Sequence, residues 1–113
     1  MEITLSSVMT QLQQITQELN RGVAATYDSE VRLADAEHAY ERELNLSLLN
    51  NQVGTVADRT AVAKLQASEL RLKADLARAE WNRCKSKMKT LELAQMSAQT
   101  AARLLETELK VLK

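Results

Sequence analysis

The chain has 113 residues, of which 45% are hydrophobic and 27% charged, with no proline, two glycines, one Trp, two Tyr and no Phe. This composition favours helix and argues against β-strands, which prefer β-branched and aromatic residues, and the length fits a single domain covering residues 1–113. The 15 basic and 15 acidic residues cancel, so the net charge implies no general attraction to nucleic acid or membranes.

Targeting signals and cysteine usage point to the cytoplasm. The chain has no apolar run near the ~18 residues of a membrane helix, and MEITLSSVMTQLQQ lacks the basic start and apolar block of a signal peptide. Cys84 is the single cysteine, which excludes an intrachain disulfide. We therefore expect a reducing, cytoplasmic location.

The first predicted helix runs from about residue 4 to residue 51. Its early apolar seam, spaced by three and four, is Leu5, Val8, Leu12, Ile15 and Leu19. The same spacing would continue through Gly22, Thr26 and Ser29, which bury little apolar surface. Steps of four would instead reach Val23, Tyr27 and Val31. This change predicts a stutter, a local unwinding of the coil, and Gly22 indicates a close helix contact, a bend or a tolerated weak spot.

A turn is predicted at about residues 50–55. Asn50, Asn51 and Gly54 are of the types that accept the left-handed conformation found where helices end. Thr55 and Asp58 then match a capping box, in which a threonine side chain and an acidic side chain satisfy the first amides of a helix. A second helix is therefore predicted over about residues 56–112.

The second helix carries a seam of heptads that runs along most of its length. Its positions are Ala63, Ala67, Leu70, Ala74, Ala77, Trp81, Cys84, Met88, Leu91, Gln95, Ala98, Ala102, Leu105, Leu109 and Leu112. Only a long helix brings these positions onto one stripe, and the stripe needs another helix against it. The predicted fold class is therefore all-α, a long antiparallel helical hairpin of the coiled-coil type.

Eight of these positions are our candidates for an oligomer or partner seam: Leu70, Trp81, Cys84, Met88, Leu91, Gln95, Leu105 and Leu109. Trp81 suits a packing anchor within the bundle or a hot spot for a partner. Gln95 interrupts an apolar seam, as do polar residues that fix register or oligomeric state. Cys84 is expected to be a buried structural thiol.

Charge predicts the pairing of the two helices. A short turn makes them antiparallel neighbours, so residues whose numbers sum to roughly 107 should lie opposite each other. The acidic residues of the first helix then face basic residues of the second. The two sets are Glu30, Asp35, Glu37, Glu41 and Glu43 against Lys64, Arg71, Lys73 and Arg78.

A second apolar stripe on the second helix predicts self-association. It comprises Val62, Leu65, Leu72, Leu76 and Ala79, and Leu93, Met96 and Leu104 extend apolar surface further along. One partner helix covers one stripe, and a long exposed stripe is unusual on a monomer. We therefore expect a homo-oligomer, with a dimer forming a four-helix bundle.

Four basic residues lie close together in the second helix: Arg83, Lys85, Lys87 and Lys89. The acidic part of the first helix does not oppose them, so they are candidates for phosphate contacts. Alternate helical residues point about 200° apart, which splits the four into two pairs. A solvated flank of the coiled coil explains them equally simply, and we favour that interpretation over nucleic-acid binding.

Several short segments of the second half carry a resemblance: Gly54-Thr55-Val56-Ala57-Asp58-Arg59, Leu70, Ala79-Glu80, Lys87-Met88-Lys89-Thr90-Leu91-Glu92 and Gln95-Met96-Ser97. In these segments the chain resembles small bacteriophage coiled-coil proteins encoded near phage recombination and single-strand-binding genes. The resemblance implies a phage accessory protein that assists recombination or replication, located in the host cytoplasm, and it carries over no catalytic residues.

The sequence therefore favours a non-enzymatic, oligomeric coiled-coil adaptor that acts through protein–protein contacts. An assembly chaperone or stalk of a secretion or phage tail machine is the alternative, and a weak nucleic-acid binder acting through residues 83–89 is another. We expect no catalytic, cofactor or metal site, since His38 is the only histidine and a metal needs several convergent ligands.

Overall fold

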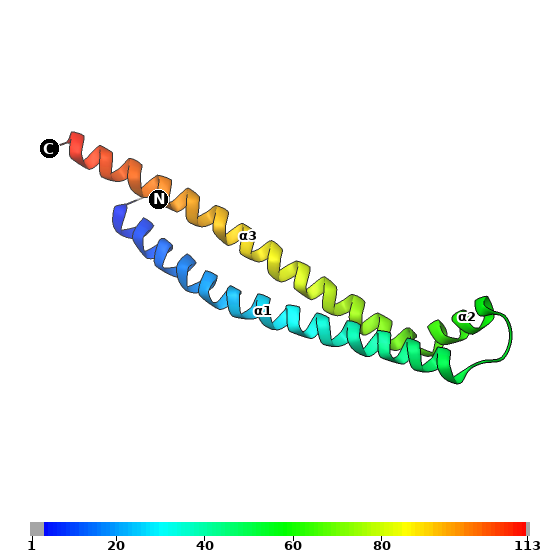
Figure 1. Ribbon diagram of the computed structural model, residues 1–113. Helices are drawn as coiled ribbons and strands as arrows, with labels where there is room; N and C mark the ends of the chain where they lie inside the picture. The colour runs from blue at the N-terminus through cyan, green and yellow to red at the C-terminus, as the bar shows by residue number, and fades with distance from the viewer. Residues whose placement is uncertain (1–3, 113) are drawn as a thin grey trace. The chain divides into compact units, whose positions relative to one another are not determined.

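The computed structural model describes residues 4–112, which form three helices: α1 (Leu5–Asn50), α2 (Val56–Gln66) and α3 (Ser68–Val111). This confirms the predicted all-α class, with α1 and α3 as antiparallel neighbours (Figure 1). The chain divides into two compact units. Unit 1 combines Met1–Thr26 with Cys84–Lys113, and unit 2 is Tyr27–Arg83.

The turn in unit 2 forms where the sequence predicts it. α1 ends at Asn50. Gly54 has a positive φ of 95°, a backbone conformation that residues with a Cβ rarely adopt. The amide of Asp58 donates to Thr55 Oγ1 at 3.1 Å, and the amide of Thr55 donates to Asp58 Oδ2 at 3.3 Å. This reciprocal pair is the capping box, and it fixes the start of α2 at Val56.

The predicted second helix is not continuous. Ala67 takes φ −91° and ψ 4°, and its amide is shared between the carbonyls of Ala63 and Leu65, which separates α2 from α3. Figure 1 shows α2 set at an angle to α3. Ala63 and Ala67 are fully buried, and Asn51 Nδ2 donates to Gln66 Oε1 at 3.0 Å. The small alanines allow the bent segment to pack closely against the end of α1.

The predicted stutter in α1 is wrong. Gly22 and Thr26 are half-buried and Ser29 is buried, so the original spacing of three and four continues unbroken. Val23 and Tyr27, which the stutter would have turned inward, are 61% and 65% exposed. The seam then continues through Leu33, Ala36, Tyr40, Leu44 and Ser47.

Small residues occupy the seam of α1 where the opposite seam carries large ones. A Cβ added at Gly22 would overlap Met88 Sδ, so the absence of a side chain at Gly22 leaves space for the methionine side chain. Tyr40 contacts Arg71, and this register brings Ser29 about level with Trp81. The stutter was predicted from the apolar area of each seam residue taken separately. Packing depends instead on the combined volume of facing residues.

The seam of α2 and α3 is confirmed as the inward face. Ala63, Ala67, Ala74, Leu91, Ala98 and Ala102 are buried, and the intervening seam positions up to Leu105 are half-buried. Leu109 and Leu112, the last two positions, are exposed. In unit 1, the C-terminal end of α3 extends past the first residues of α1 (Figure 1), which is consistent with the exposure of this end of the seam.

Candidate functional site

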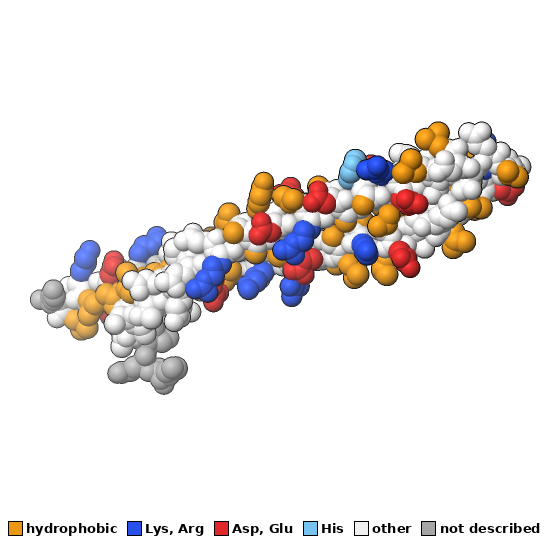
Figure 2. All heavy atoms as spheres, turned by 90° about the horizontal axis from the view of Figure 1, so that it is seen from below, with side chains coloured by type: hydrophobic (Ala, Val, Ile, Leu, Met, Phe, Trp, Pro, Cys, Tyr) orange, Lys and Arg blue, Asp and Glu red, His pale blue; other side chains and the backbone are white. Residues whose placement is uncertain are grey.

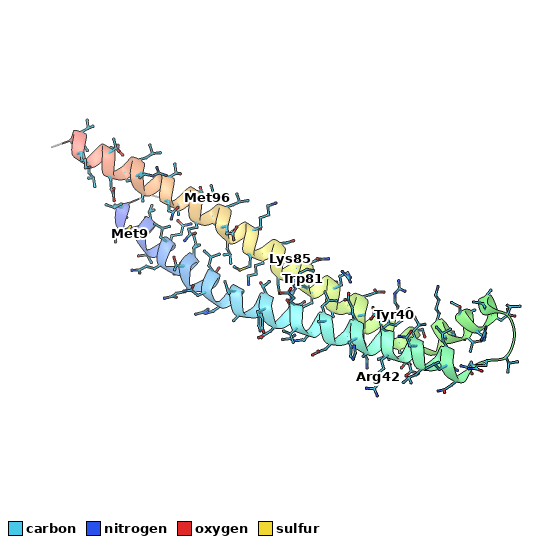
Figure 3. All side chains as sticks on the ribbon, in the orientation of Figure 1. Met9, Tyr40, Arg42, Trp81, Lys85 and Met96 are labelled. Atoms are coloured by element: carbon cyan, nitrogen blue, oxygen red, sulfur yellow. The ribbon has the colours of Figure 1, made fainter. Side chains whose placement is uncertain are left out.

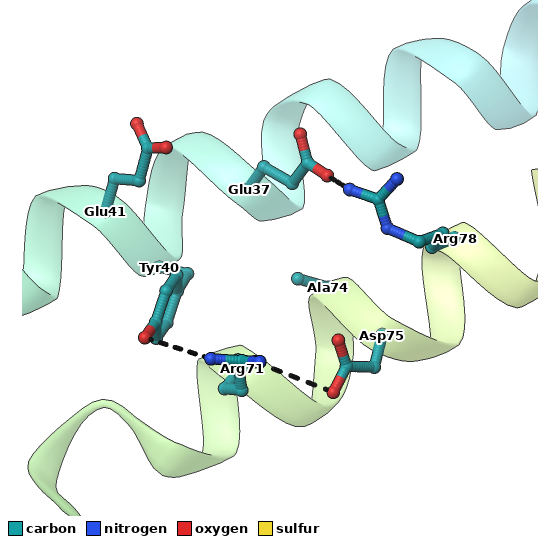
Figure 4. A pocket seen from close by; sticks show the side chains of 7 residues that line it. All are labelled: Glu37, Tyr40, Glu41, Arg71, Ala74, Asp75 and Arg78. Carbon is teal, nitrogen blue, oxygen red and sulfur yellow. Dashed lines mark hydrogen bonds and ion pairs between the residues drawn. The ribbon is translucent and has the colours of Figure 1, made fainter. Parts of the chain in front are cut away.

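A polar groove lies between α1 and α3 in unit 2. It has a volume of about 370 Å³ and is lined by Glu37, Tyr40, Glu41, Arg71, Ala74, Asp75 and Arg78 (Figure 4). Tyr40 reaches the groove from the seam of α1, while Arg42, two residues later, points away from α3 (Figure 3). The helical period thus separates a lining residue from a solvent-facing one.

Arg71 is the most connected residue in the groove. Its Nη1 donates to the Tyr40 hydroxyl at 3.5 Å, its guanidinium carbon lies 5.6 Å from the centre of the Tyr40 ring, and its Nε lies 3.7 Å from Asp75 Oδ2. The hydrogen bond with Tyr40, followed by electrostatic attraction to Tyr40 and Asp75, raises the pKa of Arg71. The guanidinium therefore remains charged, and it connects α3 to α1 through an aromatic ring.

Arg78 makes the second connection across the groove. Its Nη2 donates to Glu37 Oε1 in an interhelical ion pair (Figure 4). The predicted meeting of acidic and basic residues is confirmed for this pair, but the register differs. A sum of roughly 107 would set Glu37 opposite Leu70, about two turns before Arg78. The loop and the bend at Ala67 take up these extra residues.

The contacts of Tyr40 with Arg71 and of Glu37 with Arg78 hold α1 against α3, and we call them the clasp. The two ion pairs are open to solvent, with side chains 40–62% exposed, and an exposed pair contributes only ~0.2–1 kcal/mol. The Arg78–Glu37 pair and the Arg71–Tyr40 contact cross between the helices, so they select which turns of α1 and α3 lie opposite each other more than they stabilise the hairpin. The Arg71–Asp75 pair lies within α3. The polar contact between Tyr40 and Arg71 was not predicted from the sequence.

The second apolar stripe lies on the outward side of α2 and α3. We call Val62, Leu65, Leu72, Leu76 and Ala79 the leucine face, and all five are exposed. If the seam residues hold heptad positions a and d, the leucine face holds positions c and f, roughly 160° around the helix. It therefore lies opposite the seam and not beside it. Figure 2 shows hydrophobic side chains exposed among charges of both signs on one face of the molecule.

In unit 1, α3 carries the continuation of apolar surface predicted from the sequence. Leu93, Met96 and Leu104 are exposed there, as predicted for an unpaired stripe. Leu93 and Leu104 repeat positions f and c of the same heptad, and Met96 holds position b. These residues provide a natural comparison for the leucine face of unit 2.

The four predicted phosphate-contacting residues do not behave as one set. Arg83 belongs to unit 2, and its Nη2 lies 2.8 Å from Glu80 Oε1 on the same helix. The acidic partner of Arg83 is therefore on its own helix and not in the acidic part of α1, and the possible phosphate contacts stay a prediction. Lys85, Lys87 and Lys89 belong to unit 1 and are exposed. Lys87 and Lys89 form no ion pair with any residue among 4–112.

Seven of the eight predicted seam residues face the chain's own helices, and the eighth, Leu109, is exposed. Leu70 and Trp81 in unit 2, and Cys84, Met88, Gln95 and Leu105 in unit 1, are half-buried, while Leu91 is buried. Cys84 is a free thiol. The Met88 side chain lies against Gly22 of α1. Their burial within the single chain means that a further partner would have to bind elsewhere, or displace α1.

Within residues 4–112, no group of three or more His, Cys, Asp and Glu side chains is placed to hold a metal ion. None of the helices in this range has both the length and the apolarity needed to cross a membrane. Comparisons of the chain with models of protein families, with curated proteins and with solved structures found no match.

Proposed function

We propose that the protein is a non-enzymatic coiled-coil adaptor that self-associates and acts through protein–protein contacts. The observation that carries this proposal is the leucine face. Leu72 and Leu76 are 59% and 62% exposed on a helix whose other side is already covered by α1. Apolar side chains repeated along one exposed helix face are typical of a surface that another helix covers.

The intrachain seam supports a role in contact, because it leaves the leucine face available. The two helices satisfy each other through the seam and the clasp, so the hairpin does not need the leucine face to fold. Fully burying a leucine side chain stabilises an association by about 1.5–3 kcal/mol. Several such residues in one heptad pattern supply enough driving force for association.

The resemblance to small bacteriophage coiled-coil proteins suggests the process that such an adaptor serves. Under this proposal, the protein assists phage recombination or replication by holding other proteins. The support is the run from Gly54 to Arg59 and the segments around Lys87–Glu92 that carry the resemblance. The capping box within the first of these segments also has a structural role of its own at the start of α2.

Oligomeric state tests the proposal directly. We expect light scattering with size-exclusion chromatography at micromolar concentrations to give a mass that is a multiple of the 12.6 kDa chain. Dilution should shift the distribution towards the single chain, because association depends on concentration. A constant mass of one chain over the whole concentration range would contradict a self-associating adaptor.

A further inference from the structure

We infer that the leucine face binds a second copy of this chain, with the two α3 helices antiparallel and Leu72 of each copy opposite Leu76 of the other. This inference rests on the self-association proposed above and specifies its surface and register. It differs from a square four-helix bundle, since α3 would lie between its own α1 and the α3 of the other copy.

The position of the leucine face on the helix supports this layered arrangement. Leu72 and Ala79 hold heptad position f, and Leu76 holds position c, so they recur with the period of the intrachain seam. A helix that packs against them therefore follows α3 without a change in crossing angle. The face is roughly 160° from the seam, so α1 remains in place when the second copy binds.

The charges beside the leucine face select the antiparallel orientation. Lys73 and Glu80 both hold position g, which borders this face, and Lys73 is exposed while Glu80 is half-buried. In an antiparallel pair, equivalent flanking positions meet across the interface. When Leu72 lies opposite Leu76 of the other copy, Lys73 lies near Glu80 of that copy, and the two-fold axis repeats this pair.

The parallel arrangement lacks this complementarity. In a parallel, in-register pair, position g of one copy instead borders position b of the other, so Glu80 would lie beside Asp75 of the other copy, which is a contact between like charges. Asp75 borders the other side of the leucine face, and it lies 3.7 Å from Arg71 of its own helix. Glu80 also has an intrachain partner, Arg83 at 2.8 Å, so the pair with Lys73 of the other copy is a second contact of its carboxylate.

A pair of double substitutions in the full chain tests the surface. Leu72→Glu with Leu76→Glu should convert the protein to single chains in sedimentation-velocity experiments, with the helical circular dichroism spectrum retained because both residues are exposed. Leu93→Glu with Leu104→Glu is the matched control at positions f and c of unit 1, and it should leave association unchanged. Equal association of both variants would overturn the inference.

Charge exchange tests the register. Lys73→Glu alone should weaken dimerisation about tenfold, because it replaces two attractive pairs with two repulsive ones. Adding Glu80→Lys should restore the wild-type dissociation constant, since the two charges are then exchanged. A double variant that associates no better than Lys73→Glu would contradict the antiparallel pairing of these residues.

Cysteine cross-linking provides an independent readout in a Cys84→Ser background. A mixture of one chain carrying Leu72→Cys and another carrying Leu76→Cys should form a disulfide on mild oxidation. Either variant alone should not, because Cα atoms more than about 7 Å apart cannot be bridged. Cross-linking of each variant to itself, without cross-linking in the mixture, would establish the parallel pair and overturn the inference.

These results separate the inference from the proposal beneath it. A wild-type protein that remains a single chain at every concentration removes both. A wild-type protein that associates, and still associates after Leu72→Glu and Leu76→Glu, keeps the adaptor and removes only the leucine face as its interface.

Discussion

Gly22 shows how one missing side chain determines the distance between two helices. It lies in the middle of α1, where glycine costs about 1 kcal/mol relative to alanine. The Met88 side chain occupies the space that a Cβ at this position would need. Of the interpretations that the sequence left open for Gly22, the close helix contact is the one confirmed.

A double-mutant cycle measures this contact. We expect Gly22→Ala alone to give no gain in the free energy of unfolding, because overpacking against Met88 costs about 1–3 kcal/mol and cancels the better helix propensity. In a Met88→Ala background, the same substitution should stabilise the protein by about 1 kcal/mol. The measurement is urea unfolding followed by circular dichroism.

The control for this cycle is Ala24→Gly, an exposed position two residues away on the same helix. It should destabilise the protein by about 1 kcal/mol in both backgrounds, because it reports helix propensity without interhelical contact. Identical effects of Gly22→Ala with and without Met88 would show that the methionine is not held against the glycine.

At the scale of the element, the phase of the α1 seam decides which residues support the hairpin. Leu33 is buried, whereas Tyr27 is exposed. We expect Leu33→Ala to lower the free energy of unfolding by about 2–4 kcal/mol, through lost burial and a residual cavity. Tyr27→Gln should change it by less than about 0.5 kcal/mol. Thermal and urea denaturation of the two variants measure both effects.

The opposite order of these two effects would restore the predicted stutter. In a stuttered coil, Tyr27 would face the second helix, and removing its ring would cost more than an exposed substitution. Val23→Gln is a second exposed substitution on the same helix, and we expect it to be as mild as Tyr27→Gln.

Much of each element was predictable because its signals are local. The capping box needs only Thr55 and Asp58, and the apolar period of the second seam needs only one helix. The groove was predicted in part, through Glu37 and Arg78, because opposite charges were expected to meet. The stutter was predicted wrongly because that prediction also used only local signals. Gly22 is poorly suited to a seam when it is considered alone, but the Met88 side chain of the other helix fills the space beside it.

The bend at Ala67 and the register had no comparable signal. Neither proline nor glycine lies near Ala67, and the bend depends on how α2 packs against the end of α1. The register of α1 against α3 also depends on the bend, because adding or removing one helical turn between α1 and α3 shifts every later pair of facing residues. Both therefore depend on contacts between segments, which the pattern of one segment does not contain.

At the scale of the whole molecule, charged and apolar side chains have different roles. The charges balance over the chain, and the Arg78–Glu37 ion pair of the groove connects α3 to α1 within one chain. The exposed apolar residues are the part of the surface that intrachain contacts leave unused. If the protein self-associates as proposed, the charges beside the leucine face would provide specificity and the face itself affinity.

The capped turn also has a consequence for the order in which the hairpin folds. Contacts in the structure span 15 residues for Asn51 and Gln66, 31 for Tyr40 and Arg71, and 41 for Glu37 and Arg78. Each doubling of an open loop adds about 0.6 kcal/mol of closure entropy. Pairing that starts at the turn avoids these costs, because each formed pair shortens the next loop.

Stopped-flow kinetics of the Leu72→Glu and Leu76→Glu variant, which we expect to be a single chain, can therefore follow this progression. Ala63→Gly, beside the turn, should slow folding, whereas Ile15→Val, far from it, should mainly speed unfolding. The reverse assignment would place the start of folding at the open ends. If folding does start at the turn, the termini are the last segments to pair and the first to separate, so partners that bind transiently opened helices gain access there.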